Sequence, residues 1–464
     1  MAEPQTSTQE TVSVNANPTK TFFITMLVRD ISLVPAIIDL VDNSVDGARR
    51  LRPPSAPDES ADGSGNDARF AKLWINVRTS SEGFEVSDNC GGIPWLIARD
   101  YAFRFGRPDD APETPDAIGQ FGIGMKRALF KLGSSFAIDS RTADERFKLS
   151  VDVTEWQNTP EWVFPNVVHT LEESSVDDCG TLIRVEPLHA SVADTFKETR
   201  FRHNLALELA RTHQATISDG LTITLNNLPI DVDVQTLLNT DQIHPARISL
   251  KLDSESSSPV HVDIIAGIAA SSPTNAGWYI YCNGRLILGP DRSETTGWGE
   301  GKGKTIPQFH NQFARFKGYV FFESADVGKL PWTTTKDGID EDHPMFRAIR
   351  PRLLDVARPI IDFLNSLDAE KDRPPKDLVS LESLVDAAEK RGGVAINTLS
   401  ASERFSSPPR IPAPKRPQTQ SIQYSRPVAQ IEALKRVLKV GSARDVGEST
   451  FDFYFRRECA DNDE

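Results

Sequence analysis

Residues 32–50 read SLVPAIIDLVDNSVDGARR. Ser32 is a favourable N-cap and Pro35 is tolerated in a first turn, so the stretch predicts a helix. Its polar residues recur three, four and seven positions apart and therefore share one face: Asp39, Asp42, Asn43 and Asp46. Like charges at this spacing destabilise a helix by roughly 0.2–0.5 kcal/mol per pair. A divalent cation, a polarised water or a donor-rich ligand is expected to offset that repulsion. The alternative is a solvated acidic face, which the apolar residues around it disfavour.

A second informative segment is FEVSDNCGGIP, residues 84–94. A strand is predicted to end at Asp88, and Gly91 and Gly92 follow it. Glycines at such a point let the backbone approach a flat ligand or adopt a positive φ, and an aspartate at a strand end can accept a hydrogen bond from an exocyclic amine. A plain β-turn is the alternative. Cys90 is interpreted as a small packing residue, because no base is evident beside it.

The third segment is a glycine-rich loop that opens a helix, IGQFGIGMKRALFKLG at residues 118–133. Backbone N–H groups in such a loop, together with the helix N-terminus, form an anion site. Lys126 and Arg127 add positive charge. A polar stretch precedes the loop where a dinucleotide fingerprint needs a strand, and the Walker pattern is absent. The loop by itself is therefore only weakly specific for phosphate.

In this order and spacing, the three segments resemble the nucleotide site of the GHKL ATPases, the superfamily of gyrase B, the heat-shock chaperone ATPases, MutL and the histidine kinases. Residues 39–48, DLVDNSVDGA, resemble the family helix that carries a water-activating acid and an Mg²⁺-binding asparagine. The resemblance implies that Asp39 is the acid and that Asn43 is the metal ligand. DNCGG resembles the adenine motif, which implies that Asp88 binds the adenine amino group.

The glycine loop resembles the family's phosphate lid, in the form found in chaperone ATPases and microrchidia (MORC) proteins. CGTLIRV, residues 179–185, is similar to the family's later Gly-Thr strand, so Thr181 is implied to support the adenine through a water. The resemblance covers about residues 19–230 and implies ATP and Mg²⁺ as ligands. The residues implied to bind the nucleotide are Asn43, Asp46, Asp88, Gly92, Gly119, Gly122, Gly124, Lys126 and Thr181.

A further resemblance lies in the second half of the chain. YCNGRLI, residues 281–287, resembles a strand of the transducer domain of gyrase B, MutL and MORC proteins. LPWTTTKDGID, residues 330–340, resembles the transducer loop that brings a lysine to the γ-phosphate, which implies that Lys336 is that lysine. The alternative for Lys336 is a surface turn. Histidine kinases lack such a domain, so that branch of the superfamily is disfavoured.

The predicted fold class is α+β: a Bergerat-type α/β sandwich that binds ATP, a smaller α/β transducer-like domain, and a partly disordered helical C-terminal region. The expected boundaries are a disordered tail at 1–18, the ATP-binding domain at 19–235, the transducer-like domain at 236–370, and a linker with a helical module at 371–464. The Pro-rich composition after residue 371 is typical of a tether.

The resemblance implies an Mg²⁺-dependent, slow ATPase that acts as an ATP-gated dimerising switch or clamp. Asp39 stands where most hydrolytic members have Glu, so binding without turnover is an alternative. A chaperone-like ATPase acting on protein clients is another. The segment 401–440 carries eight basic and two acidic residues in a chain of net charge −14, and it is a candidate DNA-contacting arm or a solubilising linker.

The composition supports further expectations about solubility, membrane contact and cysteine chemistry. Of the 464 residues, 39% are hydrophobic and 25% charged, which is typical of a soluble multidomain protein. No apolar stretch is long enough for a membrane span, and the N-terminus lacks the pattern of a secretory signal. The four cysteines are far apart and form no metal or disulfide pattern. We therefore expect a cytoplasmic protein with an ATP-dependent homodimer, an unknown protein partner and no membrane contact.

Overall fold

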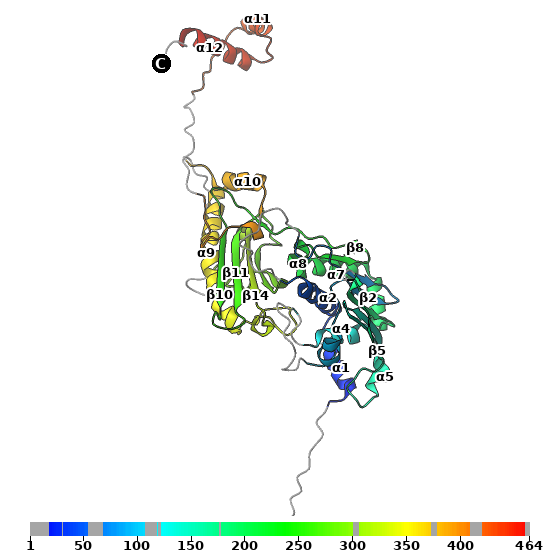
Figure 1. Cartoon of the computed structure of the whole chain (residues 1–464). Coiled ribbons are helices and arrows are strands. Elements are labelled where there is room, and N and C mark those ends of the chain that lie inside the picture. Colours follow the sequence, from blue (N-terminus) through cyan, green and yellow to red (C-terminus); the bar gives the residue numbers. More distant parts are fainter. Residues whose placement is uncertain are drawn as a thin grey trace, which may run out of the picture. The chain divides into compact units, whose positions relative to one another are not determined.

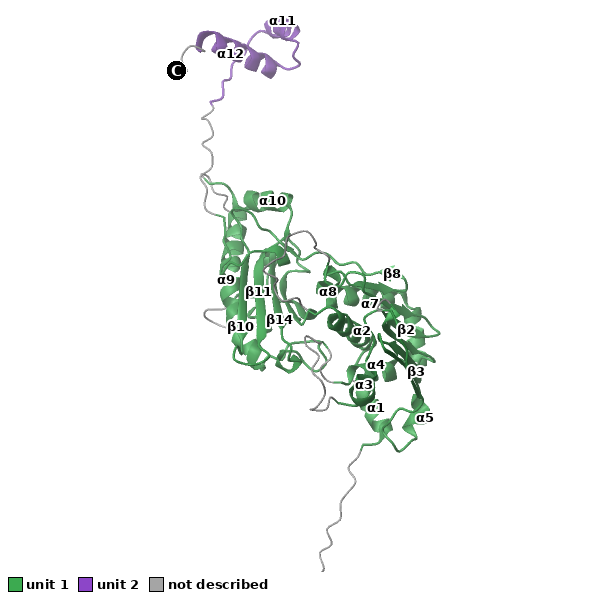
Figure 2. Ribbon diagram, viewed as in Figure 1, with its two compact units in different colours: residues 1–411 green, residues 412–464 purple. Residues whose placement is uncertain are grey.

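The computed structural model describes residues 18–29, 31–53, 68–106, 118, 122–175, 178–299, 306–372, 378–408 and 420–459. The expected tail, Gly119 and the Pro-rich part of the expected DNA-contacting arm lie outside these ranges. The chain divides into two compact units, residues 1–411 and residues 412–464, which Figure 2 colours separately.

The first unit begins with an eight-stranded mixed sheet of order β5-β4-β3-β6-β2-β1-β7-β8. β1 pairs with β7 in parallel and the other neighbours are antiparallel. The strands are β1 (Trp74–Thr79), β2 (Phe84–Asp88), β3 (Ser135–Arg141), β4 (Glu145–Asp152), β5 (Val167–Leu171), β6 (Gly180–Val185), β7 (Thr222–Leu225) and β8 (Leu228–Pro229). The helices are α1 (Lys20–Arg29), α2 (Leu33–Leu51), α3 (Trp95–Ile97), α4 (Gly124–Leu132), α5 (Val153–Gln157), α6 (Ala190–Lys197), α7 (Thr199–Thr212) and α8 (Gln214–Ser218).

The sequence predicts a hairpin with strands at 73–77 and 84–86 and a turn at 80–83, and this hairpin forms as β1 and β2; the lid helix also forms after the glycine loop. β1 and β2 pair antiparallel, and their turn is closed by the Ser80 N–H, which donates to the Gly83 carbonyl at 3.0 Å. Alternate residues of the hairpin are buried, as the period of two requires. α4 covers residues 124–132, the span that the apolar period after the glycine loop predicts. The α+β expectation for this part of the chain is confirmed.

A second sheet of five strands follows, in the order β10-β11-β14-β12-β13. Its strands are β10 (Ala246–Leu252), β11 (Val260–Ile268), β12 (Gly277–Cys282), β13 (Arg285–Asp291) and β14 (Phe316–Glu323). The long helix α9 (Pro344–Asp372) packs against β11 and β14, as Figure 1 shows. Below, residues 246–372 are called the second-sheet region.

The segment after residue 372 is more closely integrated than its Pro-rich composition suggests. α10 (Leu381–Arg391) packs on α9, and β15 (Val394–Ala395) pairs with β9 (Thr236–Leu237). Backbone bonds also join Ser402 to Arg247. Residues 378–408 therefore belong to the first unit, whereas the sequence placed a tether from residue 371 onward. The composition does not indicate this attachment, because it depends on the short pairing of β15 with β9 and on the packing of one face of α10 on α9.

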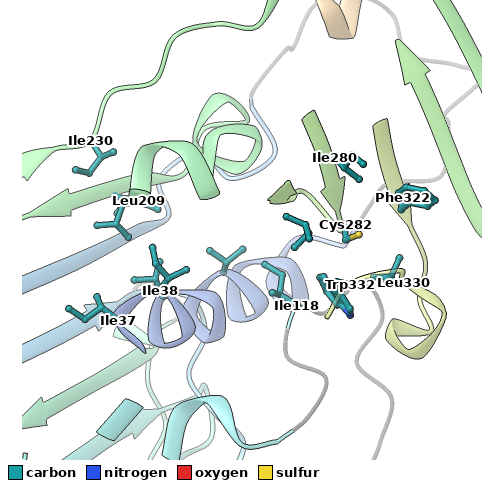
Figure 3. Close-up of a cluster of buried hydrophobic side chains, with 14 of the residues drawn as sticks. Ile37, Ile38, Ile118, Leu209, Ile230, Ile280, Cys282, Phe322, Leu330 and Trp332 are labelled. Carbon is teal, nitrogen blue, oxygen red and sulfur yellow. The ribbon is translucent and has the colours of Figure 1, made fainter. Parts of the chain in front are cut away.

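One continuous apolar core runs through both sheets of the first unit. Figure 3 shows side chains of α2, α7, β12 and β14 in one cluster, together with two residues of the loop that follows β14. The labelled members include Ile38, Leu209, Cys282, Phe322 and Trp332. α2 thus contributes to the core shared by the first sheet and the second-sheet region, and this fixes how its polar face is placed.

The second unit contains α11 (Val428–Leu438) and α12 (Ala443–Cys459), which pack on each other. The apolar period of residues 428–440 predicts the first of these helices, whereas no such period was assigned to the second. Among the residues described in either unit, no single helix is long and apolar enough to cross a membrane; the pair α1 and α2, bent by 99°, meets that criterion by length and composition only.

Candidate nucleotide site

The acidic face of α2 is buried, not solvated. The residues Asp39, Asp42 and Asp46 are 4%, 1% and 6% exposed. A carboxylate taken out of water is costly unless charged or hydrogen-bonding groups surround it. The surroundings of these three side chains therefore define what the site can bind.

Asp39 lies against the first turn of the lid helix α4. Arg127 donates two hydrogen bonds to Asp39 Oδ2, from Nη2 at 2.7 Å and from Nε at 3.2 Å. Arg285 Nη1 lies 3.8 Å from Asp39 Oδ1. A Cβ at Gly124 would stand 3.1 Å from Asp39 Oδ2, so a side chain at that position would crowd the carboxylate. The residue implied to activate water is thus held between two guanidinium groups.

Asp42 joins α2 to the second-sheet region. Arg285 of β13 forms an ion pair with Asp42, and Lys336 Nζ donates to Asp42 Oδ2 at 3.3 Å across 294 residues of sequence. His213, which follows α7, lies with Nε2 3.7 Å from Asp42 Oδ1. Lys336 is 9% exposed, so it is not a surface lysine. The loop that carries Lys336 therefore enters the same buried site as the acidic helix.

The turn around Lys336 is built to present that side chain. The Lys336 N–H donates to the Thr333 carbonyl at 2.9 Å, and Thr333 in turn donates to the Gly338 carbonyl at 3.0 Å. Lys336 has φ of +56°, a left-handed conformation that is uncommon for a residue with a side chain. Such strain is retained where the surrounding structure fixes it, often at functional positions.

Burial shifts the titration of the basic groups in this cluster. Burial and the neighbouring Arg285 lower the pKa of Lys336 from 10.5 to about 8. Burial also lowers the pKa of Arg285 from 12.5 to about 10, although Asp39 opposes that change. For His213, burial, with Arg49 and Lys336 nearby, lowers the pKa from 6.5 to about 3, so this imidazole is neutral at pH 7. An anion brought to this cluster would be stabilised by its cations.

The other end of the site is formed by Asp88 at the end of β2. Its Oδ2 accepts from the Ser44 hydroxyl at 2.6 Å. Its Oδ1 accepts from the Cys90 N–H at 2.9 Å and the Thr181 N–H at 3.2 Å. Burial raises the pKa of Asp88, and these hydrogen bonds oppose that rise. A carboxylate offers about four acceptor positions. The three contacts therefore leave Asp88 capacity for one further donor, such as an exocyclic amine.

The glycine turn after Asp88 requires glycine at two positions. Gly91 and Gly92 have φ of +86° and +69°, and a Cβ at Gly92 would stand 2.1 Å from the Arg141 carbonyl oxygen. Cys90 has no positive φ and is 2% exposed, and burial raises the pKa of its thiol. The residues thus behave as expected, with the glycines bending the backbone and the cysteine packing beneath it.

The phosphate-lid residues are only partly brought to the site. Gly122 has φ of +61° and Gly124 lies against Asp39, while Gly119 falls outside the described residues. Lys126 is 1% exposed, and its ammonium donates at 2.6 Å to the carbonyl of Ala102, in the π-helical turn Ala98–Ala102. Burial lowers the pKa of Lys126 to about 7. A phosphate contact by Lys126 would have to replace that bond, and the role stays a prediction.

The remaining implied residues also contact neighbouring elements. The Asp46 Oδ1 accepts from the Ile118 N–H at 2.6 Å, so this carboxylate holds the start of the glycine loop. Besides its N–H bond to Asp88, Thr181 shares a hydroxyl contact of 3.0 Å with Ser140. α2 therefore contacts the lid through Asp46 and the adenine end through Ser44.

Asn43 fits the role of an oxygen ligand for Mg²⁺. Its side-chain N–H donates to the Asp39 carbonyl at 2.9 Å, which directs the amide nitrogen along the helix and leaves the side-chain oxygen as an acceptor. Mg²⁺ commonly keeps waters and phosphate oxygens as ligands beside one or two protein groups. In the described ranges, no group of three or more His, Cys, Asp or Glu could hold a metal ion. Asn43 together with a nucleotide's phosphates would be such a mixed ligand set.

Comparison with known families agrees with this geometry. Residues 31–181 match the family described as histidine kinase-, DNA gyrase B- and HSP90-like ATPase. These residues form a GHKL ATPase domain. The match contains α2, the Asp88 turn and the lid helix, so the resemblance drawn from the sequence is confirmed at the level of the superfamily. No curated protein matches the chain.

Membership of the GHKL superfamily supports ATP binding and ATPase-type function by this domain. The matched residues end at 181, well before the second-sheet region that supplies Lys336 and Arg285. The contribution of those two residues is therefore argued from contacts in the structure alone.

Several residues of the site were not singled out by the sequence. Arg285 lies within the YCNGRLI segment, but no spacing rule indicates that its side chain reaches α2. His213 follows an ordinary amphipathic helix, and Ser44 has no distinguishing neighbour. Asp42 shares the polar face with Asp39, and only the structure shows that it carries the contact to the second-sheet region.

Proposed function

We propose that the chain is an Mg²⁺-dependent, ATP-gated switch in which the second-sheet region responds to the γ-phosphate of ATP bound by the GHKL domain. The observation that carries the proposal is the buried contact of Lys336 Nζ with Asp42 Oδ2 at 3.3 Å. It joins the loop after β14 to the helix that carries Asp39 and Asn43.

The proposed switch depends on differential binding of ATP and ADP. A ligand shifts a conformational equilibrium only by the difference in its affinity for the two states. Lys336 lies on the loop after β14, outside the sheet that carries Asp88, and burial of its ammonium lowers its pKa to about 8. ATP brings a γ-phosphate to which this cation can bind, and ADP does not. ATP and ADP would therefore favour different arrangements of the second-sheet region relative to α2.

Three residues of the GHKL domain have a proposed role in that switch. Asp88 accepts a hydrogen bond from the adenine amino group, and Asn43 holds Mg²⁺ together with the phosphates. Asp39 accepts a proton from a water whose oxygen bonds to the γ-phosphorus while the bond to the bridging oxygen breaks, giving ADP and phosphate. For this step the Arg127 side chain must leave at least one lone pair of Asp39 free.

A second candidate function is binding of ATP without turnover. One observation favours it: Arg127 donates two hydrogen bonds to the Asp39 oxygen that would take the proton. Release of phosphate from ATP, measured under single-turnover conditions, decides between the two candidates. If the parent protein hydrolyses ATP and Asp39→Asn does not, the switch with turnover is supported. If the parent protein releases no phosphate, binding of ATP without turnover is supported.

The switch is proposed to act through a homodimer that closes in the ATP state, with DNA as the target and residues 401–440 as the contacting arm. The basic excess of that segment supports DNA over a protein client. ATP turnover stimulated by duplex DNA would support this target. Stimulation by an unfolded protein but not by DNA would support the chaperone-like alternative.

Closure can be tested by proximity of the GHKL domains of two copies. Phe22 on α1 is 59% exposed, and Cys459 is the exposed one among the four cysteines. Phe22→Cys in a Cys459→Ser background therefore gives a labelling position near the N-terminus. Intermolecular energy transfer should rise with Mg²⁺ and a non-hydrolysable ATP analogue but not with Mg²⁺ and ADP. Equal transfer in both nucleotide states would contradict the proposed switch.

A further inference from the structure

The second unit has almost no core of its own. Across its described residues, 420–459, Val446 of α12 is the one buried side chain, and α11 buries none. A helical pair of this size buries too little apolar surface to be stable in isolation, and such small units usually gain stability from a partner or an oligomer. A further surface is therefore expected to cover the exposed apolar side chains of this unit.

α12 exposes an aromatic stripe on the side away from Val446. Phe451, Tyr454 and Phe455 are 55%, 65% and 54% exposed. Residues three and four apart share a helix face, so these three side chains lie together. The rings of Phe451 and Phe455 stack with centroids 6.3 Å apart. On the same face, Gly447 has nothing within 4 Å of the position of a Cβ, so the surface above it is open.

We propose that a second copy of this chain covers the stripe, with the two α12 helices antiparallel and Phe451 at the two-fold axis. In that arrangement a residue a given number of positions before Phe451 in one copy faces the residue the same number of positions after Phe451 in the other copy. Arg444 meets Glu458, and the Phe455 ring lies over the open surface at Gly447. An isologous contact of this kind needs a face that is complementary to itself. The α12 stripe meets that requirement in both charge and shape.

The rest of the stripe also matches in the antiparallel sense. Glu448 lies opposite Tyr454, where a carboxylate can accept from the phenolic hydroxyl. Arg444 and Glu448 form an ion pair within the helix, but they are 85% and 61% exposed, so both side chains are accessible to a second copy. A parallel pair would bring Arg444 to Arg444 and Glu458 to Glu458, and like charges facing each other disfavour it.

The available area is adequate for a dimer. A large aromatic side chain presents about 150–250 Å². Six such side chains from two copies, each more than half exposed, offer roughly 500–900 Å². The aliphatic stems of the flanking Arg and Glu residues bring the contact toward the roughly 1,000 Å² at which specific interfaces begin.

This dimer requires no nucleotide, so its test is independent of the proposed ATP switch. We expect the full-length chain without nucleotide to have the mass of a dimer in sedimentation equilibrium. Phe451→Glu should give a monomer. Phe453→Ser is the matched control, because Phe453 is 66% exposed on the same helix but lies on the Val446 side; this variant should remain dimeric. A monomeric parent, or a dimer that survives Phe451→Glu, would overturn the proposal.

Charge reversal separates loss of the interface from loss of the helix. Arg444→Glu should weaken the dimer about 10-fold, since it places two acidic side chains opposite each other at both ends. Adding Glu458→Arg should restore the parent affinity, and failure of that restoration would overturn the pairing.

Disulfide cross-linking tests the antiparallel orientation of the two α12 helices. Phe451→Cys should cross-link two copies, whereas the native Cys459 residues, about 24 Å apart along the helices, should not; a Cys459 cross-link would overturn the antiparallel arrangement.

Discussion

Replacing Lys336 by Met should remove the preference for ATP over ADP and leave the nucleotide-free protein at least as stable as the parent. The reason lies in the balance of charges around the ammonium. Lys336 Nζ donates to Asp42 Oδ2 at 3.3 Å, and Asp42 also carries the Arg285 ion pair. Met keeps the length of the side chain, so the substitution removes the charge without opening a large void.

The magnitude follows from the pKa of Lys336, which burial and Arg285 lower from 10.5 to about 8. Such a drop corresponds to roughly 3 kcal/mol by which the folded, nucleotide-free protein disfavours the charged ammonium. Lys336→Met therefore removes an unfavourable charge and should not lower the free energy of unfolding in the absence of nucleotide. With ATP bound, the ammonium gains an anionic partner worth about 1.5–3 kcal/mol. Loss of that contact should weaken ATP binding about 10- to 150-fold.

The assay is isothermal titration calorimetry with Mg²⁺ and either ADP or a non-hydrolysable ATP analogue, for the parent, Lys336→Met and Lys251→Ala. Lys251 is an exposed lysine of β10 and serves as the matched control. The parent's preference for the ATP analogue should also decline as pH rises above about 8, because Lys336 then loses its proton before the ligand binds. An unchanged ratio of ATP-analogue to ADP affinity in Lys336→Met would refute the reasoning.

The remaining predictions concern the metal, the chemistry and the pH dependence of stability. Asn43→Ala should abolish the Mg²⁺-dependent part of ATP binding measured by calorimetry, and an undiminished response to Mg²⁺ would remove Asn43 from the metal site. Asp39→Ala should leave ATP affinity within about 3-fold and stop phosphate release; release at the parent rate would show that another group is the base. His213 has its pKa lowered to about 3, so below pH 6.5 the unfolded chain takes up a proton that the folded chain does not, and stability falls as pH drops toward 3. Urea unfolding of His213→Phe should show a shallower decline over that range, and identical pH profiles would contradict this cause.

The local elements of the fold were predictable because their patterns are local. The helix expected at 32–50 is α2, at residues 33–51, and the lid helix has the predicted bounds. Both have strong apolar periods. α12 was missed, since its aromatic residues follow one another at 451–455 and give no single apolar face from which to assign a helical period.

The site was predictable only in part, because side-chain directions and long-range contacts cannot be inferred from the local spacing of residues. Lys126 and Arg127 follow the same glycine loop, yet neighbouring residues on a helix point in different directions. Arg127 faces Asp39, and Lys126 turns inward to a backbone carbonyl. Arg285, the first residue of β13, reaches Asp42 because β13 packs against α7 and α8, and that packing depends on the whole second-sheet region.

Calorimetry of the parent and of Asp88→Asn tests whether α2 and the Asp88 turn form an adenine-nucleotide site. The parent should bind ATP with Mg²⁺ and discriminate against GTP, because the free acceptor position of Asp88 matches the adenine amino group. Asp88→Asn should weaken ATP binding about 10- to 150-fold, the equivalent of roughly 1.5–3 kcal/mol for one charge-assisted hydrogen bond. Equal affinity of the parent for ATP and GTP, or undiminished ATP binding by Asp88→Asn, would contradict the claim.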